Sequence, residues 1–354
     1  MAPGRRARLR PRILRGPEDA EGGPLPRDGV VVRTHPGPRR RLGHPAVTRL
    51  DETARGVFPI SATPFSPDGA LDLESLDRLV DFYLARRVHG LTLLGIMGEA
   101  PKLTPEESRA VVRRALARVA GRVPVVVGVS SANLLALAAL ANDAMAAGAA
   151  GVMVAPTPGI AGDDALVDYM ASVFAALDPA TPVVYQDYPQ STGVPLTVEA
   201  FQRMVDAFPR LVMLKHEDCP GLTKLGRIRA EAARTGRRRV SVLVGNNAIY
   251  YPQELARGAD GAMTGFSYPE MLVEVYERFA AGDAEGAEDV FDVYLPLLRY
   301  EAQPGTGLAV RKELLFRRGA LASPAVRTPG LTLTAEDHRE IDGLVARLER
   351  RLKG

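Results

Sequence analysis

The segment LVMLKHE, residues 211–217, places an ionisable amine, Lys215, at the end of an otherwise apolar run. Burial disfavours the charged form of an amine, and a neutral lysine attacks a carbonyl carbon to form a Schiff base. The resulting iminium withdraws electrons, so a bond at the next carbon can break or form through an enamine. A second interpretation is a strand-end lysine that reaches solvent or pairs with Glu217.

Polar side chains also follow other apolar runs. They occur in GIMGE (95–99), YQDYPQSTG (185–193), KHED (215–218) and GNN (245–247). Tyr185 ends the apolar run that precedes the one carrying Lys215, and a phenol can both donate and accept a proton. We therefore expect Tyr185 to move a proton at the carbon that Lys215 attacks.

Carboxylates lie close in sequence to both residues. Asp187 follows Tyr185, and Glu217 and Asp218 follow Lys215. They suit an acid or base role, although a nearby negative charge also favours the ammonium form of a lysine. We expect Asp187 at the site, whereas a solvated loop explains Glu217 and Asp218 equally well. Glu99 is expected to be structural, accepting hydrogen bonds from loop N–H groups.

Short β-branched runs alternate with longer segments of helical apolar spacing from residue 56 onward. Eight runs predict strands at 57–63, 91–96, 123–129, 151–155, 182–185, 211–215, 240–244 and 261–264. Helices are predicted between them at 73–87, 105–120, 134–147, 164–177, 198–208, 222–235 and 248–257. This alternation predicts an α/β fold with a parallel sheet, and eight short apolar strands favour a (β/α)8 TIM barrel over an open sheet.

In such a barrel the carboxyl ends of all strands share one rim, so the polar motifs are expected to meet there. No G-x-G-x-x-G follows the first strand, which argues against a dinucleotide fold. Helical segments at 284–300, 308–318 and 335–352 predict a C-terminal helical appendage. The expected organisation is a disordered Arg/Pro/Gly-rich extension over residues 1–50, the barrel over 51–282 and C-terminal helices over 283–354.

Composition excludes several classes of protein. Residues 1–55 hold thirteen arginines and six acids, whereas the whole chain has a net charge of +3. The basic charge therefore belongs to the N-terminal extension, and no nucleic-acid partner is expected of the remaining residues. The single cysteine, Cys219, rules out a disulfide framework within the chain and fits a reducing cytoplasm. The five histidines lack ligand spacing, so neither a metal site nor a cofactor is expected. No apolar stretch is long enough to span a membrane.

The motifs together resemble the dihydrodipicolinate synthase and N-acetylneuraminate lyase family of aldolase-like barrels, from about Gly56 to the last helices. The matching segments are GVFPISATPFSPDGALD (56–72), GIMGEAPKLTPEE (95–107), VPVVVGV (123–129), VVYQDYPQSTGVPLT (183–197) and LVMLKHE (211–217). The resemblance implies that Lys215 forms an imine with an oxo acid and that Tyr185 is the proton-handling tyrosine. It also implies a homo-oligomer, a dimer or tetramer.

The family's substrate-binding positions are carried over as Gly95, Ile96, Met97, Asp187, Ser191, Asn246 and Met263. Several depart from the family's pattern. Ile96 and Met97 replace the hydroxyl pair that holds a pyruvate-like carboxylate, so either backbone N–H groups hold it or the substrate differs. Ser191 replaces an arginine, and Pro156-Thr157-Pro158 replaces P-Y-Y.

These departures argue against the lysine-pathway synthase. A lyase that makes or breaks a C–C bond through the Lys215 imine is the leading prediction, acting on a small 2-oxo acid or related carbonyl compound. A hydro-lyase using the same imine is the nearest alternative. A non-catalytic descendant that binds a small ligand is a third interpretation.

Overall fold

The computed structural model describes residues 49–353, and the predicted extension lies almost wholly outside them. Eight parallel strands form one sheet in the order β1-β8-β7-β6-β5-β4-β3-β2. A bridge between Ile60 and Thr92 joins β1 to β2 and closes the sheet into a barrel. The strands are β1 (Gly56–Val57), β2 (Leu91–Leu93), β3 (Val125–Gly128), β4 (Gly151–Val154), β5 (Val183–Asp187), β6 (Leu211–His216), β7 (Ser241–Val244) and β8 (Gly261–Ala262). The predicted (β/α)8 fold is confirmed.

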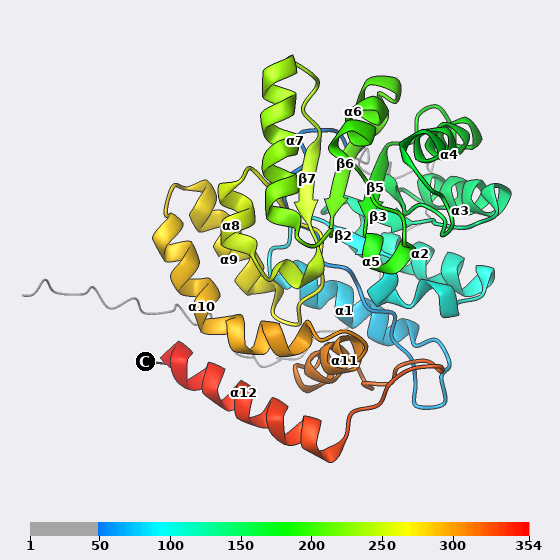
Figure 1. Ribbon diagram of the computed structural model, residues 1–354. Helices are drawn as coiled ribbons and strands as arrows, with labels where there is room; N and C mark the ends of the chain where they lie inside the picture. Colours follow the sequence, from blue (N-terminus) through cyan, green and yellow to red (C-terminus); the bar gives the residue numbers. More distant parts are fainter. Residues whose placement is uncertain (1–48, 354) are drawn as a thin grey trace, which may run out of the picture.

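Helices follow the strands and form the outer layer (Figure 1). The barrel helices are α1 (Leu73–Ala85), α2 (Pro105–Val119), α3 (Leu134–Ala146), α4 (Asp163–Ala176), α6 (Val198–Ala207), α7 (Gly221–Thr235), α8 (Tyr251–Ala256) and α9 (Pro269–Ala280). Short helical turns lie in the loops: η1 (Ile96–Gly98), η2 (Ala100–Lys102), α5 (Pro189–Thr192) and η3 (Asn246–Ala248). The start of α2 is set by a capping box, in which Thr104 and Glu107 satisfy each other's backbone N–H groups.

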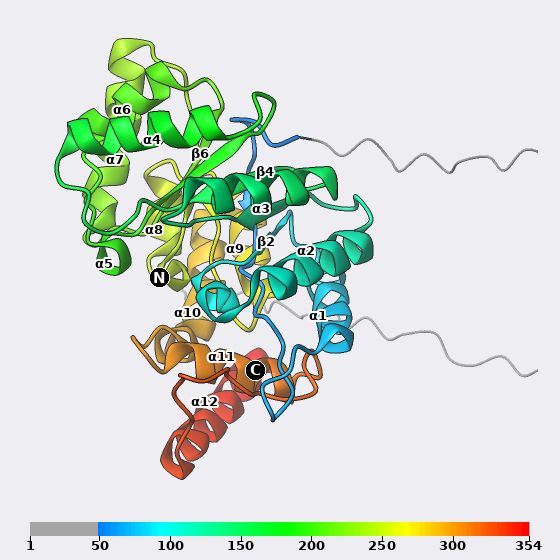
Figure 2. The same ribbon diagram turned by 90° about the vertical axis from the view of Figure 1, so that its right-hand side faces the viewer.

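Three further helices extend the barrel: α10 (Ala284–Glu301), α11 (Gly307–Arg317) and α12 (Ala335–Lys353). Figure 2 shows α11 and α12 grouped on one side of the barrel, and α10 packs against both α9 and α12. Helix α11 meets the loops that follow β7 and β2, because Arg311 bonds Asn247 and Lys312 bonds Glu99. It therefore lies at the same end of the barrel as the carboxyl ends of the strands.

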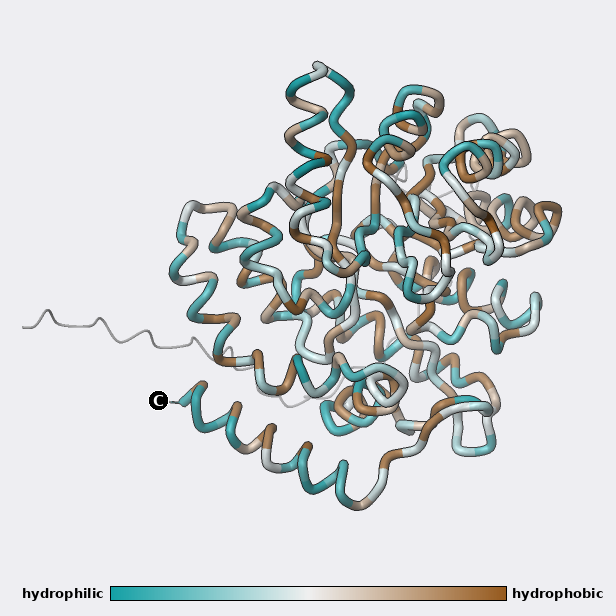
Figure 3. The backbone as a smooth tube through the Cα atoms, viewed as in Figure 1, coloured by the Kyte–Doolittle hydropathy of each residue, from teal (hydrophilic) through white to brown (hydrophobic). Residues whose placement is uncertain are grey.

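The strands bury side chains on both faces, which gives two apolar layers. The inner layer fills the barrel and includes Phe58, Ile60, Val126, Met153, Val184, Met213, Leu243 and Met263. The outer layer joins the strands to the helices and includes Val154, Tyr185, Leu214 and Val244. Figure 3 shows the continuous hydrophobic run along β6 and β7 beside the alternating pattern of the helices. No described helix is both long and apolar enough to cross a bilayer.

Candidate active site

Lys215 lies near the carboxyl end of β6 and faces the inside of the barrel. It pairs in register with Leu243 of the inner layer and comes two residues after Met213, another inner-layer side chain. Lys215 is only 3% exposed, so the amine does not extend into bulk water. Its Nζ lies 2.9 Å from Oε2 of Glu217. The alternative interpretation of a solvent-reaching lysine is excluded, whereas the pairing with Glu217 is present.

Gln186 completes a group that we call the inner cluster: Lys215, Gln186 and Glu217. Gln186 pairs in register with Lys215 across β5 and β6, so both side chains point to the same face. Its Nε2 donates to Oε2 of Glu217 at 2.7 Å. All three residues are buried. The cluster thus brings an amine, a carboxylate and an amide together on the inner face of the barrel.

Tyr185 does not join this cluster, which corrects the predicted pairing with Lys215. It pairs with Val154 and Leu214 and packs in the outer layer between strand and helices. Its hydroxyl has no hydrogen-bond partner among the described residues. Burial, followed by the charge of Asp187, raises the pKa of Tyr185 well above its usual value, so the phenol stays protonated.

A bulge in β6 explains this correction. Val183 pairs with Leu211, but Val184 pairs with Met213, so Val212 is an extra residue. An unbroken register would place residues 185 and 187 on the same face as Lys215. The extra residue reverses that parity, because one residue of slip moves a strand's side chains to the opposite face.

Asp187 is therefore also on the outer face, contrary to its predicted place at the site. It belongs to what we call the outer cluster: Asp187, His216 and Lys224. Oδ2 of Asp187 lies 3.2 Å from His216 Nδ1 and 2.7 Å from Lys224 Nζ. Burial alone would lower the pKa of His216, but the hydrogen bond and charge of Asp187 outweigh it, and the pKa lies above its usual value. This cluster ties β5 and β6 to α7.

The remaining predicted positions divide between the inner layer and the surface. Met263 lies in the inner layer and Met97 packs against it. A Cβ on Gly95 would stand 2.9 Å from the Ile60 side chain, so Gly95 lies over the same layer. By contrast, Ile96 is 45% exposed and Ser191 is exposed on α5.

Asn246 contacts the inner cluster through the backbone. Its Nδ2 donates to the carbonyl of Glu217, and the Glu217 N–H donates to the carbonyl of Asp187 at 2.9 Å. Glu217 is thereby fixed at both its backbone groups. Tyr188 is half-buried. Burial, followed by the negative charge of Glu217, raises the pKa of the Tyr188 phenol.

The sequence does not assign Gln186 or Tyr188 to the site, and it leaves Glu217 open between an acid or base role and a solvated loop. For Gln186 the signal is the spacing to Pro189, because Gln186 is three residues before that proline, as the tyrosine is in the Y-N-x-P pattern that the segment resembles. Beyond the cluster, Cys219 is exposed in the loop that follows β6. Within residues 49–353, no group of three His, Cys, Asp or Glu side chains is placed to hold a metal ion.

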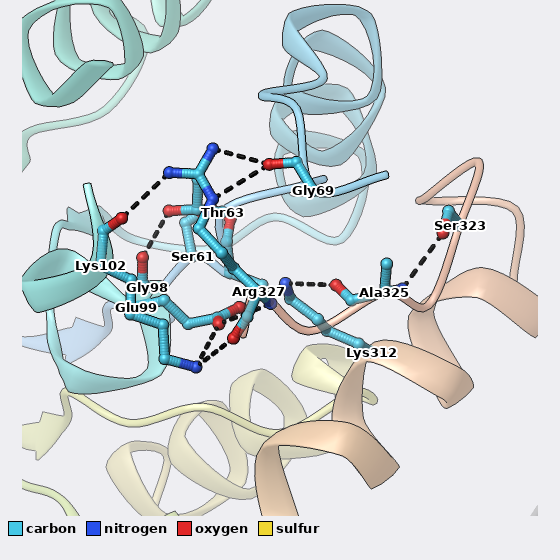
Figure 4. A network of polar contacts seen from close by, with 11 residues as sticks. Ser61, Thr63, Gly69, Gly98, Glu99, Lys102, Lys312, Ser323, Ala325 and Arg327 are labelled. Atoms are coloured by element: carbon cyan, nitrogen blue, oxygen red, sulfur yellow. Dashed lines mark hydrogen bonds and ion pairs between the residues drawn. The ribbon is translucent and has the colours of Figure 1, made fainter. Parts of the chain in front are cut away.

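Glu99 is structural, as predicted, but its partners are side chains more than loop N–H groups. Figure 4 shows its carboxylate between Lys102 and Lys312. Lys102 Nζ lies 2.8 Å from Oε2 and Lys312 Nζ 2.5 Å from Oε1. The N–H of Arg327 also donates to Oε2 at 3.1 Å. This carboxylate joins the loop after β2 to the C-terminal segment.

The family model of the dihydrodipicolinate synthetase family matches residues 53–348. The chain belongs to this family. Among family members, the Rhodopseudomonas palustris dihydrodipicolinate synthase structure has a TM-score of 0.83 and 44% identity, covering 85% of this chain and 99% of that one. The match to the dihydrodipicolinate synthetase family confirms the predicted resemblance, and the moderate identities mark a divergent member.

Two curated relatives from the family differ in activity. The 4-hydroxy-tetrahydrodipicolinate synthase of Sorangium cellulosum is 35% identical, over 84% of this chain and 96% of its own length. The L-2-keto-3-deoxyarabonate dehydratase of Azospirillum brasilense is 31% identical, over 83% of this chain and 94% of its own length. The chain is accordingly a lyase of the aldolase-like type.

Proposed function

We propose that the chain is a lyase that forms an imine between Lys215 and a small 2-oxo acid, then makes or breaks a C–C bond at the adjoining carbon. The observation that carries this proposal is the Lys215 amine, which is 3% exposed and lies on the inner face of the barrel. In barrel enzymes, the carboxyl ends of the strands hold the active site. An imine needs no cofactor, because the protonated nitrogen itself accepts the electrons of the broken bond.

The side chains near the rim favour a substrate other than that of the lysine-pathway synthase. Ile96 and Met97 have no hydroxyl to offer a carboxylate, and Ser191 lies exposed on α5. Each hydrogen bond lost to a charged group weakens binding by roughly 1.5–3 kcal/mol. A carboxylate here would rely on backbone N–H groups, such as those of η1.

Dehydration is a second candidate function, and the Azospirillum brasilense relative favours it because that protein is named as a dehydratase. Loss of a proton from the carbon next to the imine gives an enamine, which can expel the hydroxyl of the following carbon as water when an acid returns a proton to that hydroxyl. The two reactions share the imine and diverge only in the bond that breaks.

Borohydride reduction followed by mass spectrometry tests the imine. We expect a stable adduct on Lys215 with pyruvate or another compound from a panel of 2-oxo acids, and none with Lys215→Ala. Analysis of the trapped acid's products by NMR then separates a C–C lyase from a dehydratase. If no 2-oxo acid is trapped and Lys215→Ala still binds a member of the panel, the chain is a ligand-binding module and the proposal fails.

We further propose a cytoplasmic homo-oligomer, a dimer or tetramer, without a nucleic-acid or membrane partner. The family resemblance supports this assembly, although one related structure, 26% identical with a TM-score of 0.76, is that of a monomeric dihydrodipicolinate synthase variant. Light scattering coupled to size exclusion measures the mass directly. Salt-sensitive DNA binding that disappears on deletion of residues 1–50 would contradict the absence of a nucleic-acid partner.

A further inference from the structure

The carboxylate of Glu217 is held against the Lys215 amine by two independent arrangements. The first is direct contact, since Oε2 lies 2.9 Å from Nζ of Lys215 and accepts from Gln186 Nε2 at 2.7 Å. Both partners of the ion pair are nearly enclosed, with side chains that are 4% and 10% exposed. One oxygen thus takes two donors and lies within proton-transfer distance of the amine.

The second arrangement is the close approach of Glu217 to the backbone of Gly245. A Cβ on Gly245 would stand 2.1 Å from Cγ of Glu217 and 2.5 Å from its Oε1. Only glycine leaves this space, so the side chain folds back onto the end of β7. Together with the backbone bonds to Asn246 and Asp187, this fixes the carboxylate in place.

The other nearby acids are engaged elsewhere. Asp187 and Asp218 both pair with Lys224 of α7, at 2.7 Å and 3.1 Å, on the outer side. Tyr185 is also in the outer layer. Within residues 49–353, Glu217 is the only carboxylate in ion-pair contact with Lys215.

We propose that Glu217 is the acid and base for the chemistry of Lys215, a role that rests on the proposed imine function. Glu217 first takes a proton from the Lys215 ammonium, and the freed amine adds to the carbonyl carbon. A proton then passes from the nitrogen to the former carbonyl oxygen, which gives the carbinolamine. The carboxylic acid then returns its proton to the carbinolamine hydroxyl, the C–O bond breaks and water leaves. An ammonium, a carboxylate and a carbonyl have become an iminium, a carboxylate and water.

The charge balance of the site favours this assignment. A cation faces the Glu217 carboxylate before the reaction and another faces it afterwards, so no unpaired charge is left buried. The regenerated carboxylate can then remove a proton from the carbon next to the iminium, which gives the neutral enamine. Gln186 stays neutral throughout and orients the oxygen that exchanges the proton.

The rate of imine formation with pyruvate, measured by timed borohydride trapping, tests this role. If pyruvate gives no adduct in the wild-type protein, the fastest-trapped acid of the panel replaces it. General acid–base catalysis is typically worth about 10²–10⁴-fold. We expect Glu217→Gln to slow trapping by about 10²-fold or more while Lys215 is still modified after long incubation. Glu217→Asp should retain an intermediate rate, and Asp218→Asn, the neighbouring carboxylate outside the cluster, should trap as the wild type does.

Chemical rescue separates catalysis from a merely structural role. Added formate should restore part of the trapping rate in Glu217→Ala, where the shortened side chain leaves room for a carboxylate. A Glu217→Ala variant whose slow trapping does not respond to formate would show that Glu217 only neutralises Lys215. If the wild type is trapped and Glu217→Gln is trapped at the same rate, Glu217 is not the acid and base, while the proposed imine function stands. No adduct in the wild type with any acid contradicts both the role and the proposed function.

Discussion

Gly245 is the residue on which the geometry of Glu217 depends. Its Cα faces the Glu217 side chain so closely that a single added methyl group would overlap Cγ and Cδ. An alanine at position 245 would therefore meet a steric obstacle in the Glu217 side chain. The carboxylate would have to move to make room for the added methyl group.

We therefore predict that Gly245→Ala displaces Glu217 and slows imine trapping by at least about 10-fold, since general acid–base catalysis depends on hydrogen-bond reach. The matched control is Gly226→Ala in α7, where a Cβ meets nothing within 4 Å. That change should leave trapping unaltered and stabilise the helix by roughly 0.5–1 kcal/mol. Equal trapping rates in the two variants would contradict the prediction.

At this scale the sequence located the lysine and left Glu217 open as its partner, but it did not place Gln186 beside them. Lys215 stands out because a charged residue ends an apolar run, which is a local signal. The choice between Tyr185 and Gln186 depends on which of them points to the same face of the sheet as Lys215, and the extra residue Val212 decides it. The bulge lies in β6 and arises from its pairing with β5, so the apolar pattern of either strand alone does not predict it.

At the scale of elements, β6 separates two polar environments. Lys215 faces the barrel, while His216, one residue later, faces α7 and α8. Glu254 of α8 lies on this outer side, 8% exposed, and its Oε2 has no partner among the described residues. Burial raises the pKa of Glu254 to about 7, although the charge of His216 opposes the shift.

A raised carboxyl pKa means that the folded state binds a proton more tightly than the unfolded state. The free energy of unfolding contributed by Glu254 therefore falls as pH rises from the ordinary carboxyl pKa of 4.5 to about 7 and is constant above that. In the wild type, Glu254 should lower the free energy of unfolding by ~3 kcal/mol between these two pH values. We predict that this decrease is absent in Glu254→Gln. Urea unfolding at pH 4.5 and pH 8 measures it, with the exposed Glu288→Gln as the control. Parallel pH dependence in wild type and Glu254→Gln would exclude the effect.

The elements themselves were largely readable from the sequence. Runs such as 151–155 and 211–215 fall on β4 and β6 because buried parallel strands need continuous apolar side chains. The first and last strands are predicted longer than they are, since β1 and β8 span two residues each. The eighth helix, α9, was not among the predicted segments.

On the scale of the whole molecule, the Glu99 carboxylate connects the barrel to its C-terminal segment (Figure 4). Lys312 of α11 is fully buried against it, and Lys312 Nζ also donates to the Ala325 carbonyl at 2.8 Å. Arg327 lies over the Phe65 ring at 4.1 Å and makes a two-pronged ion pair with Glu107. The loops after β1 and β2, together with the first turn of α2, therefore converge on one segment of the C-terminal region.

Removing one partner of a buried pair leaves the other charge uncompensated. We predict that Lys312→Met lowers the free energy of unfolding by about 3 kcal/mol. This value is at the lower end of the cost of breaking a buried ion pair, because Lys102 still contacts Glu99. Adding Glu99→Gln should recover part of this loss. Arg203→Met, which breaks the exposed pair with Asp164, should change stability by less than about 1 kcal/mol. Similar urea midpoints for Lys312→Met and Arg203→Met would show that the buried pair contributes no more to the free energy of unfolding than the exposed pair does.

The sequence predicted the C-terminal helices but not where they pack. Their apolar spacing is a local property, whereas the contact of α11 with the loops after β2, β7 and β8 joins residues 46 to 213 positions apart. Lys312 and Arg311 look like ordinary surface residues of a helix until those loops enclose them.

The exposed Cys219 has a practical consequence for observing this protein. It is the chain's only thiol and lies two residues beyond Glu217, in the loop that leaves β6. A maleimide fluorophore attached there would report on the rim without substitution of any buried side chain. Stopped-flow emission from the labelled enzyme would then follow ligand entry in real time, separately from the chemistry at the amine.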